Sequence, residues 1–303
     1  MELTLGPLAY HWTPEKRRDF YARIADEAPV STVYLGEVIC SKRAPFFERE
    51  LPQVIDRLER AGKRVVLSSL AEVMLKRERQ ATSDLMDSEG PEVEVNNAAG
   101  LMARGGRAHR IGPFLNAYSV ATIDWMAGQG ATHVCLPPEM PGAAVGVAAE
   151  AARDLGLGVE VQAFGRAPLA VSARCYHARA HGRTKDNCQF VCEEDSDGMP
   201  LATRDEQPIL RVNGIQTQSE SYIELLAELP VMRDMGITHA RLLPQDVDMV
   251  AVARIFDDVM QGRSSVEEGR SRLGELCVGT GFSNGFWYGE AGYRHIARRA
   301  DAA

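Results

Sequence analysis

Short apolar runs alternate with longer amphipathic stretches along most of the chain. Runs such as those at residues 65–67 and 134–136 are apolar at consecutive positions, which is typical of strands that are buried on both faces. The pattern predicts an additional strand at residues 209–212. The eight principal strands are predicted at residues 3–8, 32–35, 64–69, 92–95, 109–111, 132–136, 158–163 and 239–243.

Helix signals fill the intervals between these strands. Thr13 followed by Pro14 combines an N-cap residue with a proline in the first helical turn. Apolar residues recur at helical spacing over residues 45–62. Helices are also predicted over residues 148–155 and 221–235, because a glycine follows each of these segments and can end a helix.

Eight strands that alternate with helices predict an α/β fold, namely a TIM-like (β/α)8 barrel. An open, doubly wound sheet has the same alternation, but the count of eight and the even spacing of the first seven strands favour the barrel. We expect residues 1–303 to form a single barrel domain. The pattern breaks after the seventh strand, and residues 166–218 are predicted to be an insertion over the C-terminal mouth, where barrel active sites lie.

Composition and charge narrow the functional class. The chain of 303 residues is 45% hydrophobic and 25% charged, which is ordinary for a globular protein. Its formal net charge of -8 argues against nucleic acid as a partner. We find no apolar run long enough for a transmembrane segment and no basic leader before an apolar stretch, so we expect a cytoplasmic location. The six cysteines should then not form structural disulfides.

Four of the cysteines are placed as metal ligands would be. Cys175, Cys188 and Cys192 fall inside the predicted insertion, and Cys40 follows the second strand. Both positions are carboxyl ends of strands, so the insertion could fold across the mouth and bring the four thiols together. Four converging thiolates would suit an iron–sulfur cluster or a closed zinc site, although the spacing matches no compact ferredoxin or zinc-ribbon motif. The apolar neighbours of the other two cysteines predict buried thiols; these are Cys135 and Cys277.

Two histidines leave a second metal site open. His177 and His181 are four residues apart, which would place them on one face of a helix. A zinc site could therefore form from Cys188, Cys192 and both histidines. The segment lacks the glutamate of the H-E-x-x-H zinc motif, and the chain has no G-x-S-x-G nucleophile motif.

Further candidates lie close to the cysteines. Glu37, at the end of the second strand, is a candidate general acid or base, or else a capping or ion-paired residue. His177 and His181 are candidate proton relays. Lys42 and Arg43 could hold an anionic ligand or offset the charge of a thiolate-bound cluster, or they could lie in an exposed turn.

Several segments resemble one known family. They include Val33 to Glu37, Cys40 to Arg43, Asn116 to Ser119, Gly130 to Pro137 and Asn284 to Gly289. Together they resemble the collagenase-like peptidase family, and within it the UbiV branch of oxygen-independent ubiquinone biosynthesis. The resemblance covers nearly the whole chain apart from the last dozen residues.

The resemblance implies a set of functional properties. Cys40, Cys175, Cys188 and Cys192 would ligate a [4Fe–4S] cluster in an iron–sulfur subunit of a heterodimeric hydroxylase. With a UbiU-type partner, the chain would support hydroxylation of the ubiquinone precursor ring without O₂, with prephenate as oxygen donor. A small lipid-binding accessory protein of the same pathway would be a further partner. Two alternatives are a zinc-stabilised, non-catalytic scaffold subunit and a cysteine-dependent peptidase.

Overall fold

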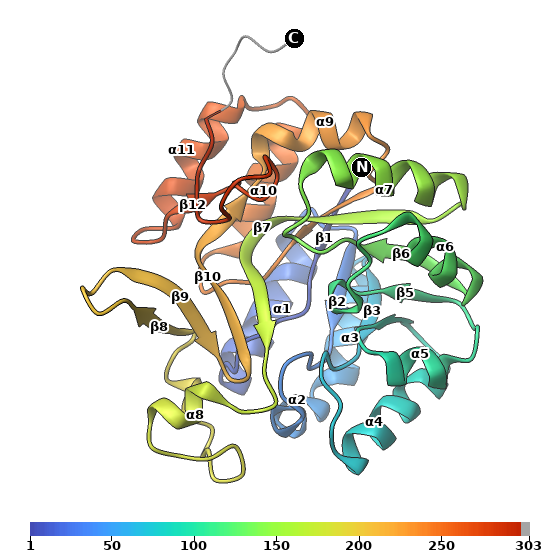
Figure 1. The fold of residues 1–303 in the computed structure, drawn as a ribbon, viewed down its shortest axis with the longest axis vertical. Helices are drawn as coiled ribbons and strands as arrows, with labels where there is room; N and C mark the ends of the chain where they lie inside the picture. The colour runs from blue at the N-terminus through green and yellow to red at the C-terminus, as the bar shows by residue number, and fades with distance from the viewer. Residues whose placement is uncertain (298–303) are drawn as a thin grey trace.

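The computed structural model describes residues 1–297, which contain a closed barrel of eight parallel strands (Figure 1). Each strand pairs with the next along the chain, and the last barrel strand pairs with both the seventh and the first, which closes the ring. The predicted (β/α)8 barrel is therefore confirmed. The strands are β1 (Glu2–Leu5), β2 (Thr32–Leu35), β3 (Arg64–Ser68), β4 (Glu92–Val95), β5 (His109–Ile111), β6 (Ala131–Cys135), β7 (Gly158–Val171) and β11 (His239–Leu242).

Helices cover the outside of this barrel (Figure 1). The predicted start of the first helix is confirmed, since Thr13 accepts a hydrogen bond from the backbone N–H of Lys16 and Pro14 is the first helical residue. No helix within residues 1–297 is long and apolar enough to cross a membrane. The helices are α1 (Pro14–Glu27), α2 (Pro45–Glu48), α3 (Leu51–Arg60), α4 (Lys76–Asp87), α5 (Ala98–Arg104), α6 (Val120–Gly128), α7 (Gly142–Asp154), α8 (Tyr176–Ala180), α9 (Leu229–Asp234), α10 (Met249–Met260) and α11 (Val266–Leu276).

Alternate residues of the barrel strands serve two different environments. Leu3 and Leu5 of β1 belong to the apolar core that packs the barrel against its helices. Thr4, between them, is fully buried and contacts Glu160 of β7 across the barrel. Successive strand residues point to opposite faces, so one set of side chains builds the apolar layer and the other fills the barrel axis. The strands are buried on both faces, as predicted, but the inner face is polar.

The predicted helix over residues 221–235 is wrong in its first part. Ser221 to Glu224 complete the strand β10 (Gln216–Glu224), where Tyr222 pairs with both β7 and the short strand β12 (Phe282–Ser283). Only α9 is helical, after the 3₁₀ turn η4 (Leu226–Glu228). Backbone pairing with strands distant in the sequence outweighs the local helical spacing here. Similarly, residues 45–62 form two helices rather than one, and α7 begins six residues before the predicted start at residue 148.

The segment after the seventh barrel strand forms an antiparallel extension of the sheet. The first half of β7 pairs with β6 and β11, whereas its second half pairs with β10. Next to β10 lie β9 (Pro208–Asn213), which confirms the additional strand predicted at 209–212, and then β8 (Met199–Ala202). Residues 166 and 218, the predicted limits of the insertion, lie within β7 and β10. Helix α8 and the 3₁₀ turn η3 (Val191–Glu193) connect β7 to β8.

Gly36, directly after β2, turns the chain toward Cys40. Its φ is +119°, and a Cβ atom added there would lie 2.6 Å from the backbone oxygen of Ser68. We expect Gly36→Ala to destabilise the protein at the upper end of the roughly 1–3 kcal/mol typical of strained backbone. Gly128→Ala is the matched control, because Gly128 lies at the end of α6 with nothing within 4 Å and no positive φ. Equal denaturation midpoints for the two variants would contradict the prediction.

Candidate functional site

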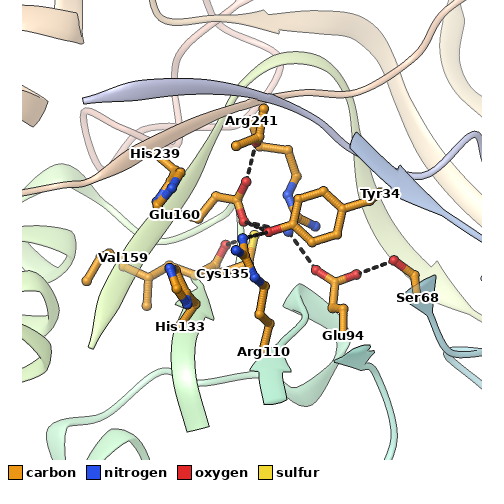
Figure 2. Close-up of polar contacts among 12 residues, drawn as sticks. Tyr34, Ser68, Glu94, Arg110, His133, Cys135, Val159, Glu160, His239 and Arg241 are labelled. Atoms are coloured by element: carbon orange, nitrogen blue, oxygen red, sulfur yellow. Dashed lines mark hydrogen bonds and ion pairs between the residues drawn. The ribbon is translucent and has the colours of Figure 1, made fainter. Parts of the chain in front are cut away.

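The barrel axis holds a network of polar side chains instead of an apolar core (Figure 2). Every one of the eight barrel strands contributes to it. The charged members are at most 2% exposed. The contributing residues, in chain order, are Thr4, Tyr34, Ser68, Glu94, Arg110, Cys135, Glu160 and Arg241.

Arg241 is at the centre of this network. Its Nη2 donates to Glu94 Oε1 and to Glu160 Oε2, both at 2.6 Å. Its guanidinium also lies over the ring of Tyr34, 4.0 Å from the ring centroid. The Tyr34 hydroxyl donates to Glu160 Oε2 at 2.7 Å and accepts from Arg110 Nη1 at 2.9 Å (Figure 2). One arginine thus holds two carboxylates from opposite parts of the barrel.

The network keeps a buried carboxyl group ionised. Burial alone would raise the pKa of Glu160, but the adjacent Arg241, with a hydrogen bond from Thr4, lowers that pKa to about 2. Burial and the neighbouring Glu160 raise the pKa of Tyr34 well above its usual value, so the hydroxyl remains a hydrogen-bond donor. The axis therefore contains fixed charges of both signs that have little access to water.

A cavity at the mouth of the barrel lies against this network. Glu94 and Arg241 contribute to its wall together with amide side chains of β7, β10 and nearby loops. The Oδ1 atom of Asn96 and the Oε1 atom of Gln216 are buried without a hydrogen-bond partner in the described part of the chain. The cavity has a volume of about 30 Å³, which is enough for one or two water molecules that such atoms could bind. Its polar lining residues are Glu94, Asn96, Gln162, Gln216, Gln218, Arg241 and Gln245.

Two histidines lie beside the network, with ring centroids 5.3 Å apart: His133 on β6 and His239 on β11. Burial, with Arg110 and His239 nearby, lowers the pKa of His133 to about 4 from 6.5. The unfolded chain thus takes up a proton as the pH falls below 6.5, whereas the folded chain does so only near pH 4. We expect stability to decrease from pH 6.5 to pH 4, and less steeply in His133→Phe. Denaturant titrations across this range test it, and identical slopes for both proteins would contradict the prediction.

All four predicted cysteine ligands line one small cavity. Cys40 comes from the loop after β2, and Cys175, Cys188 and Cys192 come from the connection between β7 and β8. Helix α8 of this connection lies at the lower edge of the molecule, where α2 also lies, in the view of Figure 1. Residues separated by more than 130 positions in the chain thus bring their thiols to the same place.

Local backbone interactions position these cysteines. Oε1 of Glu37 accepts hydrogen bonds from the backbone N–H groups of Ile39 and Cys40, both at 2.9 Å, so Glu37 shapes the Cys40 loop. Cys175 is the N-cap of α8, and its Sγ accepts from the backbone N–H of Ala178 at 3.4 Å. Phe190, with a φ of +54°, precedes the 3₁₀ turn that carries Cys192.

The two basic residues next to Cys40 both face the cysteine cavity. Arg43 is 1% exposed, so it does not lie in an exposed turn. Its Nη1 donates to the carbonyl of Ala9, and its Nη2 donates to Asn213 Oδ1. Lys42 Nζ lies 3.6 Å from Cys188 Sγ and donates to the carbonyl of Lys185 at 2.8 Å. Burial raises the pKa of the Cys192 thiol, while the positive charge and hydrogen bond of Arg43 lower it. Two cations therefore flank the four sulfur atoms.

The two candidate histidines occupy different environments. His177 is fully buried and lines the cysteine cavity, and its Nε2 lies 2.8 Å from Asp195 Oδ2. His181 is exposed, and its ring stacks on that of His177 with centroids 5.6 Å apart. Within residues 1–297, no group of three or more His, Cys, Asp or Glu side chains is arranged to hold a metal ion.

The barrel network was missed by sequence reasoning. A signal for it exists, because Glu94, Arg110, Glu160 and Arg241 are charged residues that lie next to apolar residues inside the predicted barrel strands. A charge is rarely buried without a partner, so several such residues on barrel strands indicate ion pairs across the axis.

Comparison with known proteins places the chain in a family. Among solved structures, it is similar to a chain of the tryptophan synthase complex from Pyrococcus furiosus, at 13% sequence identity and a TM-score of 0.42; the match covers 90% of this chain and 96% of that chain. The family model of peptidase family U32 matches residues 12–297, which is nearly the whole chain. The match includes Cys40, Cys175, Cys188, Cys192 and seven of the eight barrel strands. This protein belongs to peptidase family U32, the collagenase-like peptidase family.

Proposed function

We propose that this chain is the iron–sulfur subunit of an O₂-independent hydroxylase that acts on the aromatic ring of a ubiquinone precursor. Cys40, Cys175, Cys188 and Cys192 would hold a [4Fe–4S] cluster, and a UbiU-type subunit would be the partner. Prephenate is the proposed oxygen donor, and a small lipid-binding protein of the same pathway is a further proposed partner. The observation that carries the proposal is the convergence of these four cysteines on one cavity.

The chemistry of the donor set supports a cluster. Iron–sulfur clusters are held by cysteine thiolates, and a set of four is the usual number. The lining contains four cysteines, and two cations face them from the Cys40 loop. Lys42 and Arg43 would offset the negative charge that thiolates and sulfides bring to the site. The backbone N–H of Ala178, which donates to Cys175 Sγ, adds a hydrogen bond of the kind that tunes such a centre.

A zinc ion and a cluster differ in how widely their ligands are spread. In a closed zinc site, all four sulfur atoms lie about 2.3 Å from one metal. A four-iron cluster takes one cysteine per iron, so its ligands are spread over a larger volume. Four thiols around a common cavity fit this wider requirement.

When bound, the cluster would relay electrons between the ring and the oxygen donor, or it would tie the insertion to the barrel. The chain's own residues would do the rest: Arg43 and Lys42 stabilise the charged centre, and Glu37 holds the loop that carries Cys40.

Anaerobic purification followed by iron, sulfide and zinc analysis tests the proposal. We expect about four irons and four sulfides per chain. One zinc ion without sulfide would instead indicate the zinc-stabilised scaffold. A metal-free chain whose proteolytic activity is abolished by thiol alkylation would indicate the cysteine-dependent peptidase. A chain without any metal under strictly anaerobic conditions would overturn the cluster assignment.

The partner and the reaction need a second experiment. The chain with its cluster, co-expressed with a UbiU-type subunit, should co-purify with it and restore anaerobic ring hydroxylation in cells that lack both subunits. Isotope-labelled prephenate should then transfer its labelled oxygen to the ring. Hydroxylation that proceeds without the cluster-bearing chain would contradict the proposal.

A further inference from the structure

A third, larger cavity lies beside the two described above. It has a volume of about 380 Å³ and lies between the ends of β2 and β3 and the helices α1 to α4. Its lining is largely apolar, and this size and character are typical of sites for small organic molecules. The main apolar lining residues are Tyr21, Phe47, Leu51, Leu67, Leu70 and Leu85.

One buried charged side chain of this cavity has no partner within residues 1–297. Arg17, on α1, is only 5% exposed and lines the cavity. Its guanidinium lies over the ring of Phe47, 4.9 Å from the centroid. Its Nε atom is buried without an acceptor, and no side chain within residues 1–297 forms an ion pair or hydrogen bond with the guanidinium. A buried charge without a partner is costly, so an arginine in this position fits an anionic group that comes from outside the chain.

Two carboxylates of the cavity, Glu78 and Glu37, have donors of their own, and the third, Glu48, is exposed to solvent. Glu78 accepts from Ser41 Oγ at 2.6 Å and from the backbone N–H groups of Met74 and Leu75 at 2.9 Å. Glu37 accepts from two backbone N–H groups of the Cys40 loop. These contacts hold both acids in structural roles. The other charged lining residues, Glu48 and Arg77, are exposed to solvent, so Arg17 is the buried charge among the described lining residues that is left for a ligand.

We propose that this cavity binds an amphipathic anion, that is, an apolar molecule with one carboxylate or phosphate head group. The head group would pair with Arg17, and the apolar body would lie against Phe47 and the surrounding leucines. An arginine fork matches both kinds of oxyanion. The ligand would lie against the loop of residues 36–44, which also contributes Cys40 to the cysteine cavity.

Calorimetric titration of the full-length chain tests this site. The probes are decanoate, decyl phosphate and 1-decanol, which share an apolar chain and differ in the head group. We expect saturable binding of at least one anion, and binding of 1-decanol that is roughly 10- to 100-fold weaker. The preferred anion identifies the head group as a carboxylate or a phosphate.

Four variants locate the binding. Arg17→Met should weaken anion binding by a similar factor of roughly 10 to 100, and Arg17→Lys should restore part of it. Arg18→Met is the matched control, because the Arg18 side chain is 57% exposed and is not part of the lining. Ala81→Trp, at an exposed lining position on α4, should block the cavity without removing a charge. Denaturation midpoints confirm that each variant is folded.

The proposal is overturned by any of three results. They are equal affinity for 1-decanol and the anions, unchanged binding in Arg17→Met, and the absence of saturable binding of both anions. None of these readouts depends on the cluster or on ring hydroxylation, so the outcome is separate from that of the proposed function.

Discussion

Single replacement of Cys40, Cys175, Cys188 or Cys192 by serine is expected to remove most of the iron and sulfide from the anaerobically purified chain. The four thiols line one cavity and come from two separate segments, so each variant removes one of the four proposed ligands. A serine oxygen is a poor replacement for the soft thiolate that iron–sulfur clusters require. Iron and sulfide analysis, with the visible spectrum, measures the loss.

Cys277→Ala is the matched control for these variants. Cys277 is 3% exposed, packs in the main apolar core and is not part of the cysteine cavity. The control should keep the wild-type iron content, with a modest decrease in stability from the lost packing. Equal loss of iron in Cys277→Ala, or full retention of iron in all four serine variants, would contradict the assignment of the ligands.

Arg241→Met is expected to lower the free energy of unfolding by about 3–5 kcal/mol. Arg241 is 2% exposed and donates to two buried carboxylates, so the substitution leaves Glu94 and Glu160 without their shared counter-charge. Breaking a buried ion pair at one partner is costly because the other charge stays out of water. Equilibrium denaturation at pH 7 measures the change.

An exposed ion pair provides the control for Arg241. Arg60 and Asp56 are 2.6 Å apart, but their side chains are 73% and 63% exposed. Arg60→Met should therefore change the free energy of unfolding by only about 0.5 kcal/mol. If Arg241→Met is no more damaging than Arg60→Met, the barrel network does not have the stabilising role described here.

The pH dependence of stability in the wild type and in Arg241→Met distinguishes the loss of the ion pair from a loss of packing. The pKa of Glu160 is lowered to about 2, so its contribution to stability is present above the unfolded pKa near 4.5 and is lost as the pH falls toward 2. Arg241→Met removes the main cause of the lowered pKa. Its stability should therefore decrease less steeply over this pH range than that of the wild type.

The amino-acid pattern alone predicts the order of the barrel strands. Consecutive apolar residues placed both ends of seven of these strands to within three residues, whereas β7 continues eight residues beyond its predicted end at residue 163; the count of eight predicted the closed barrel. It also placed Cys40 and the other three cysteines after strands that run in the same direction. These features follow from local periodicity and from the rule that parallel strands share one carboxyl-terminal face.

Which side chains face the barrel axis, and which of them meet there, depends on the tertiary fold. Glu160 and Arg241 are 81 residues apart, and their ion pair depends on the closure of the barrel between β7 and β11. Ser221 to Glu224 became a strand because β7 and β12 offer backbone partners. Arg17 remains unpaired because of the helices that surround it. Such pairings depend on contacts between residues far apart in the chain, which local periodicity does not encode.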